Sequence, residues 1–133
     1  MQERGDQVKY KHTMPEDVRA LCVAHVQGYE RRCRELRAKR SGKAEQSLLE
    51  QQGGSQDKQS VVAVEIALIQ AMQGIKNHEV RTHLRKALLL NICNRKQFPY
   101  ERLYVPTVGK KEFYRRKQDL LMGLADILGY LED

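Results

Sequence analysis

Five cationic side chains lie within eight residues near the end of the chain, in the stretch KKEFYRRK that begins at Lys110. Lysine and arginine neutralise phosphate groups, and arginine also donates hydrogen bonds to the edges of bases. Pro106 and Gly109 precede the stretch, which is turn chemistry in front of a predicted helix. These residue types favour the binding of a polyanion by the beginning of a helix.

The position of these cations opposes the helix dipole. The N-terminal end of a helix carries a partial positive charge, so acidic residues are favoured in the first turn and lysines are not. Lys110 and Lys111 lie in the predicted first turn, where only Glu112 suits the dipole. The misfit costs roughly a few tenths of a kcal/mol, whereas the neutralisation of phosphates gains several. The alternative interpretation is a solvated surface helix.

Six residues are the candidates for contact with double-stranded DNA. On a helix that begins near Lys110, the outward side chains of the first three turns are long donors that reach bases and phosphates. The predicted base contacts are Arg115 and Gln118, the predicted phosphate contacts are Lys110, Lys111 and Tyr114, and Arg116 suits either role.

Other groupings of reactive side chains are weak. The spacing of His78 and His83 does not place both on one helical face, so a zinc pair is not expected. The sequence contains no phosphate loop, nucleophile elbow or HExxH motif. The three cysteines include no CxxC pair, and His25 has no evident partner that would orient it toward Cys22. We therefore expect neither an enzyme, nor a metal, nor a cofactor.

The composition suits one helical domain. The chain has 133 residues, of which 41% are hydrophobic and only 6% are aromatic, which favours helices over a β-sandwich or barrel. Its 24 basic and 17 acidic residues give a net charge of +7, as is common among nucleic-acid-binding proteins. The sequence shows neither a signal peptide nor an apolar run long enough to span a bilayer. We therefore expect an all-α, cytoplasmic protein with no membrane partner.

The first part of the chain divides into three predicted segments. Residues 1–12 are a polar, loose tail. Residues 13–40 form an amphipathic helix that starts at a capping box made by Thr13 and Glu16. The apolar stripe of this helix packs either on its own domain or across a homodimer. Residues 41–59 are rich in glutamine and contain two adjacent glycines, which predicts a polar loop or linker.

Residues 60–133 are predicted to form a small helical bundle. Ser60 caps a mostly apolar helix that ends near Gly74. Asn77 caps the next helix, which carries apolar residues at helical spacing on its buried side. Those residues are Val80, Leu84, Ala87, Leu88 and Ile92.

A C-terminal helix-turn-helix is predicted at about residues 98–128. A short helix over residues 99–105 is followed by Pro106 and Gly109, and the last helix begins near Lys110. In this motif the second helix enters the major groove. Its predicted inner side is Phe113, Leu120, Leu124, Ile127 and Leu131, and its predicted outer side is Lys111, Arg115, Gln118 and Met122.

The stretch NICNRKQFPYERLYVPTVGKKEFYRRKQDLLMGLADILGYL resembles the C-terminal module of phage and prophage transcriptional regulators of the ArpU kind, which are related to sigma-factor region four. The resemblance covers roughly residues 85–131. It implies a recognition helix that begins near Lys110, control of phage or mobile-element genes in the cytoplasm of a bacterial host, and RNA polymerase as a partner. The residues that carry it are Gly109, Lys110, Phe113, Tyr114, Arg115 and Arg116.

The sequence thus predicts a DNA-binding transcriptional regulator of phage or mobile-element origin. The alternative is a phage-encoded protein–protein interaction module, such as an inhibitor or assembly factor, with the first helix as its interface. Salt separates the two, because contacts with phosphates weaken steeply as salt rises and a hydrophobic interface does not.

Overall fold

The computed structural model describes residues 14–40 and 44–131, and the side chains of residues 14–38 and 56–131. Within these residues the elements are helices joined by turns, without a strand, so the predicted all-α class is confirmed. The helices are α2 (Glu16–Gln27), α3 (Tyr29–Arg40), α4 (Ala44–Ala71), α5 (His78–Cys93) and α6 (Lys110–Ile127), with the short 3-10 helix η1 (Tyr100–Arg102) before α6.

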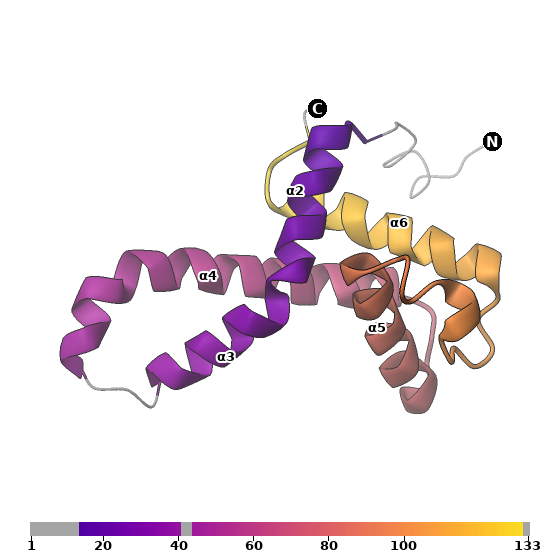
Figure 1. The fold of residues 1–133 in the computed structure, drawn as a ribbon, viewed down its shortest axis with the longest axis horizontal. Coiled ribbons are helices and arrows are strands. Elements are labelled where there is room, and N and C mark those ends of the chain that lie inside the picture. The colour runs from indigo at the N-terminus through magenta and orange to yellow at the C-terminus, as the bar shows by residue number, and fades with distance from the viewer. Residues whose placement is uncertain (1–13, 41–43, 132–133) are drawn as a thin grey trace.

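α6 is the central helix of the body of the molecule. α4 packs along it, and α2 and α5 also contact it (Figure 1). Its Phe113, Leu120 and Leu124 are fully buried. Burial of a side chain of this size contributes about 1.5–3 kcal/mol, so these residues fix α6 firmly in place. The residues at its N-terminal end are therefore presented on a rigid element.

α3 and the first half of α4 run side by side away from the body (Figure 1). Tyr29 anchors the base of this pair, because its hydroxyl donates to Glu65 Oε2 of α4 at 3.0 Å and accepts from Arg85 Nη2 of α5 at 2.9 Å. Further along, Arg32 Nε lies 3.8 Å from Asp57 Oδ1 of α4. These polar contacts tie three helices together where the pair leaves the body.

The predicted helix over residues 13–40 consists of two helices that meet at Gly28. The guanidinium of Arg32 folds back over Gly28, and its Nη1 donates to the carbonyl of His25 at 3.1 Å. A Cβ atom at Gly28 would lie 2.5 Å from that nitrogen, which is too close. The absence of a side chain at Gly28 therefore provides the space that the Arg32 guanidinium fills. A side chain that bonds a carbonyl of the helix is a common cause of a kink.

The apolar stripe of this first segment packs within its own chain. Cys22, Val26 and Tyr29 are buried in the common core, so this part of the stripe packs on its own domain. The predicted tail over residues 1–12 and the predicted capping residue Thr13 lie outside the described residues.

The predicted loop over residues 41–59 is wrong from Ala44 onward, because α4 begins there. Residues 44–52 are alanine, glutamate, glutamine, serine and leucine, most of which favour a helix, and each of the two glycines that follow costs only about 1 kcal/mol. Contact with α3 stabilises the longer helix. The predicted cap, Ser60, accordingly lies inside α4.

α5 agrees with its prediction. The side chain of Asn77 caps the helix, since its Oδ1 accepts from the Val80 N–H at 3.1 Å. The apolar residues predicted to face the core are buried, apart from Val80 in the first turn, which is half-buried. The buried ones are Leu84, Ala87, Leu88 and Ile92.

The short helix predicted over residues 99–105 is a single 3-10 turn, η1. The hydroxyl of Tyr100 donates to the Val108 carbonyl at 2.7 Å, so a side chain folds this segment back toward the start of α6. Between residues 98 and 128, all of which the structure describes, α6 is the one α-helix. Two α-helices joined by a tight turn, as predicted for this stretch, are therefore not found there.

α6 begins at Lys110 as predicted, but two of its side chains face the other way. Met122, predicted to point outward, is buried, whereas Ile127, predicted to point inward, is exposed. The middle of α6 contacts both α4 and α2, so every residue from Leu120 to Ala125 is buried. Ile127 lies in the last turn, where it lines a surface pocket.

Candidate nucleic-acid interface

The six predicted DNA contacts differ in their exposure. All of them lie in the first three turns of α6, on an element held by its buried side. Lys110, Lys111 and Arg115 are exposed, Tyr114 and Gln118 are half-buried, and Arg116 is buried.

Arg116 is part of the scaffold, which corrects its predicted role in DNA contact. Its Nη1 donates to the carbonyls of Ala71 at 2.9 Å and Gln73 at 3.0 Å, and its Nε donates to Glu112 at 2.8 Å. These carbonyls lie at the C-terminal end of α4, where helix carbonyls lack partners and the dipole is negative. The guanidinium therefore caps α4 from within the fold and does not face the solvent.

The exposed cations of α6 form weak local pairs. Lys110 pairs with Glu101, and Arg115 Nη1 lies 3.2 Å from Asp119 Oδ2, with both partners of each pair more than a third exposed. Lys111 forms no ion pair with any described residue. Exposed pairs contribute only about 0–1 kcal/mol, so a phosphate group displaces such a carboxylate at little cost.

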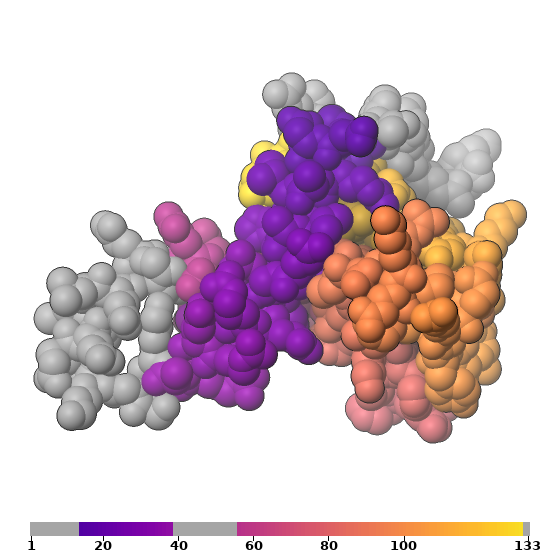
Figure 2. All heavy atoms as spheres, viewed as in Figure 1, coloured from indigo at the N-terminus to yellow at the C-terminus, as the bar shows by residue number. Residues whose placement is uncertain are grey.

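The sequence did not indicate that two cations from elsewhere in the chain join this surface. Arg19 of α2 donates from Nη1 to Gln118 Oε1 at 3.1 Å. The guanidinium carbon of Arg95, just after α5, lies 5.5 Å from the centre of the Tyr114 ring. Figure 2 shows the connection that contains Arg95, in orange, beside the beginning of α6. No local sequence signal identifies either arginine, because only the packing of α2, α5 and α6 brings them together.

Lys117 is the most constrained cation of the group. Its side chain is only 7% exposed, and its Nζ lies 5.7 Å from the centre of the Tyr114 ring, which holds it by a cation–π contact. Burial, together with the nearby charges of Arg95 and Arg19, lowers the pKa of Lys117 to about 8. Its ammonium group is thus repelled by two arginines and has little solvent to screen it.

Arg19, Arg95 and Lys117 form what we call the Tyr114 cluster, together with Tyr114 itself. None of the three cations has an ion pair with a carboxylate among the residues that the structure describes. Tyr114 is held in turn by edge-on contact with Phe113, with ring centres 5.3 Å apart. The cluster is therefore a fixed concentration of positive charge, in which the buried Lys117 adds to the positive potential around Arg19 and Arg95 and does not itself face the solvent.

His25 and Ser60 form a second arrangement with chemical interest. His25 Nδ1 lies 2.6 Å from Ser60 Oγ, and its Nε2 lies 3.0 Å from the Tyr130 hydroxyl. Adjacent serine and histidine side chains are the pattern of an activated nucleophile. Ser60 is only 4% exposed, however, so its hydroxyl is closed to a substrate. We interpret this chain of hydrogen bonds as the contact that joins α2, α4 and the C-terminal residues.

Two further groups bear on the chemistry of this region. Burial lowers the pKa of His25, and the charge of Arg32 lowers it further, so the imidazole is held in its neutral form. Burial raises the pKa of the Cys22 thiol to about 11, which keeps it protonated and unreactive at neutral pH. The described residues contain no group of three or more side chains that would suit a metal ion.

Comparison of the chain with protein-family models, curated proteins and solved structures gives no match. None of the helices in the described part of the chain is both long enough and apolar enough to cross a membrane.

Proposed function

We propose that the chain binds double-stranded DNA through the surface around the first half of α6, and that it regulates phage or mobile-element genes by this means. The observation that carries the proposal is the Tyr114 cluster, whose three cations have no described carboxylate partner. A backbone of regularly spaced phosphates supplies the missing negative charge. The release of condensed counterions then provides the driving force.

Lys111 and Arg115 are the residues that face the bases in this proposal. They lie four residues apart on α6, so both project from the same exposed edge of the helix. Arginine donates two hydrogen bonds to guanine in the major groove, and each such contact contributes about 1–3 kcal/mol of discrimination. Gln118, the other predicted base contact, is instead engaged by Arg19 and keeps that arginine in place.

Phosphates on either side of this edge meet the remaining cations. Lys110 lies at the first turn of α6, and Gly109 before it provides no side-chain cap, so the first N–H groups of the helix are also directed toward a phosphate. Arg95 and Arg19 approach from the other side of Tyr114. This way of binding DNA requires only α6 and the residues packed beside it. It does not require the second α-helix that a helix-turn-helix would place before the turn.

The test is a titration of labelled duplex DNA from a random-sequence pool, followed by fluorescence anisotropy. We expect the double variant Lys111→Ala, Arg115→Ala to bind roughly ten- to hundredfold more weakly than the parent, because two cations that contact the duplex are lost. The matched control is Arg34→Ala, which removes an exposed arginine from α3 and leaves the α6 surface intact.

Thermal unfolding of the same variants shows whether a loss of binding reflects a loss of structure. Both α6 side chains are exposed, so the double variant is expected to unfold at nearly the temperature of the parent. Equal affinity of the parent and the double variant at physiological salt, or an equal loss of affinity in Arg34→Ala, would contradict the proposed surface.

A further inference from the structure

The bend of the chain at Gly28 leaves a hollow beside α5. Before the bend α2 packs against α5, whereas after it α3 packs along α4. The helices α3 and α5 therefore diverge below α2 in Figure 1, and a surface pocket of about 360 Å³ lies where they separate. A volume of this size is within the range of pockets that hold small molecules.

Apolar side chains line this pocket from both sides. Val26 and the ring of Tyr29 come from the bend, and Leu89 and Leu90 come from α5. Val26 and Tyr29 are buried, whereas both leucines are only half-buried and leave apolar surface in contact with water. A molecule that covers these leucines removes that surface from water, which favours its binding.

Arg85 adds a fixed cation to the lining of the pocket. Its Nη2 donates to the Tyr29 hydroxyl at 2.9 Å, and its guanidinium carbon lies 5.7 Å from the centre of the Tyr29 ring. The same hydroxyl donates to Glu65, so Arg85 reaches that carboxylate only through Tyr29 and has no direct ion pair with a described residue. A guanidinium has several N–H donors in a planar fork that matches a carboxylate. The donors that Arg85 does not use on Tyr29 are therefore held ready for an anion.

The charges that line the pocket are unequal. Among the described residues around it, Arg85 and the exposed Lys86 are the cations and Glu30 is the carboxylate. Glu30 lies in the first turn of α3, where a negative charge suits the helix dipole. Lys86 forms no ion pair with any described residue. The local excess of charge is positive, so the pocket favours an anion over a neutral or cationic molecule.

We propose that this pocket binds a medium-chain aliphatic carboxylate. The carboxylate accepts hydrogen bonds from Arg85, Lys86 adds to the positive potential around it, and the hydrocarbon chain covers Leu89 and Leu90. An inorganic anion would use only the cations and a neutral hydrocarbon only the leucines, so the two features together select a molecule that has both parts. The site is separate from the proposed DNA-binding surface, because none of its lining residues belongs to α6.

The first test uses the full parent chain and two probes with the same hydrocarbon tail, octanoate and octylammonium. Backbone amide chemical shifts are followed by NMR as each probe is added. Octanoate is expected to shift the amides of Gln27, Leu89 and Leu90 with a Kd of about 1 mM or lower. Octylammonium is expected to bind at least about tenfold more weakly, because Arg85 repels it. Equal affinity of the two probes would overturn the proposal, as would octanoate shifts that are absent from α5.

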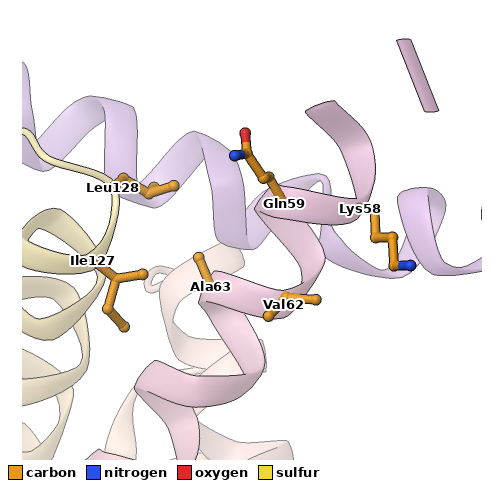
Figure 3. Close-up of a pocket in the computed structure, with 6 residues that line it drawn as sticks. All are labelled: Lys58, Gln59, Val62, Ala63, Ile127 and Leu128. Atoms are coloured by element: carbon orange, nitrogen blue, oxygen red, sulfur yellow. The ribbon is translucent and has the colours of Figure 1, made fainter. Parts of the chain in front are cut away.

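A second surface pocket, between α4 and the end of α6, provides the control for position. Figure 3 shows Ile127 and Leu128 on one side of it and Ala63 of α4 across from them, and Lys58 also lines it. It too combines apolar groups with a cation, but Lys58 is exposed and no described side chain holds it in place. Ile127→Gln changes this second pocket alone and is expected to leave the affinity for octanoate unchanged.

The second test removes the proposed donor. Arg85→Gln is expected to weaken the binding of octanoate roughly tenfold, because the carboxylate loses its charged partner. Thermal unfolding of this variant shows whether it keeps its fold without the contact to Tyr29, and if it does not, the comparison of the two probes on the parent decides. Lys86→Gln, at an exposed position, is expected to weaken binding by about twofold to threefold. An affinity that a folded Arg85→Gln variant retains in full, or that Ile127→Gln abolishes, would overturn the proposal.

Discussion

The ring of Tyr114 contacts the cationic ends of two side chains, Arg95 and Lys117. The ring face attracts both cations, which offsets part of their mutual repulsion but adds no negative charge. Arg19 adds a third positive charge nearby, and burial prevents water from screening Lys117. The ammonium of Lys117 therefore gains more from an added anion than a solvent-exposed lysine does.

The depressed pKa of Lys117 predicts a pH dependence of DNA binding. In the free protein Lys117 loses its proton near pH 8, and a bound phosphate favours the charged form and raises its pKa. The complex therefore holds more protons than the free protein above pH 8, so affinity falls as the pH rises from about 8 toward 10. Well below pH 8 Lys117 is charged in both states, and it contributes little pH dependence there.

Lys117→Arg provides the matched variant for this measurement, because arginine keeps its charge over the whole range. The parent is expected to lose up to about tenfold in affinity per pH unit above pH 8, and the variant is expected to lose much less. Anisotropy titrations between pH 7 and pH 9.5 check this. Identical pH profiles for parent and variant would mean that Lys117 does not respond to the bound phosphate.

At the scale of single elements, the C-terminal end of α4 depends on two arginines from other helices. α4 has no basic residue in its own last turn. Arg116 of α6 donates to the carbonyls of Ala71 and Gln73, and Arg81 of α5 donates from Nη1 to the carbonyls of Met72 at 3.3 Å and Ile75 at 2.8 Å. Two guanidinium groups thus donate to carbonyls at the end of α4 and in the turn that follows it.

The capping role of Arg116 predicts a large effect on stability. Arg116→Met leaves two carbonyls and Glu112 without their donor, and the free energy of unfolding is expected to fall by about 2–4 kcal/mol. Arg115→Ala, at the neighbouring exposed position, is expected to change it by less than about 0.5 kcal/mol. Urea denaturation of both variants measures the two values. Equal stability of Arg116→Met and the parent would mean that the cap is not important to the fold.

Over the whole molecule, the sequence correctly predicted those helix ends that are determined by residues close by in the chain. The cap at Asn77 and the start of α6 at Lys110 follow from residues within one turn, and both are found in the structure. The extent of α4 was missed because two glycines resemble a break, while its contact with α3 is not visible in the sequence. The spacing of apolar residues along α6 also could not show that Met122 is buried. Its burial depends on which other helices pack around α6, and the sequence of α6 does not contain that information.

In the candidate site, too, some residues could be predicted from nearby sequence, and others depend on how the helices pack. Exposed Lys111 and Arg115 were identifiable from their place near a predicted helix start. Arg19 and Arg95 were not, because they lie far apart in the chain and meet only through the packing of α2 and α6. Arg116 could not be distinguished from Arg115 by residue type, and only its position against the end of α4 assigns it to the scaffold.

The central claim is that the surface around the start of α6 binds DNA by neutralising phosphates. It is tested most directly by the salt dependence of duplex binding by the full chain. If Lys110, Arg19 and Arg95 each neutralise one phosphate, the logarithm of the binding constant is expected to fall linearly with the logarithm of the salt concentration, with a slope of about −3. A slope near zero, or no binding at low salt, would contradict the account.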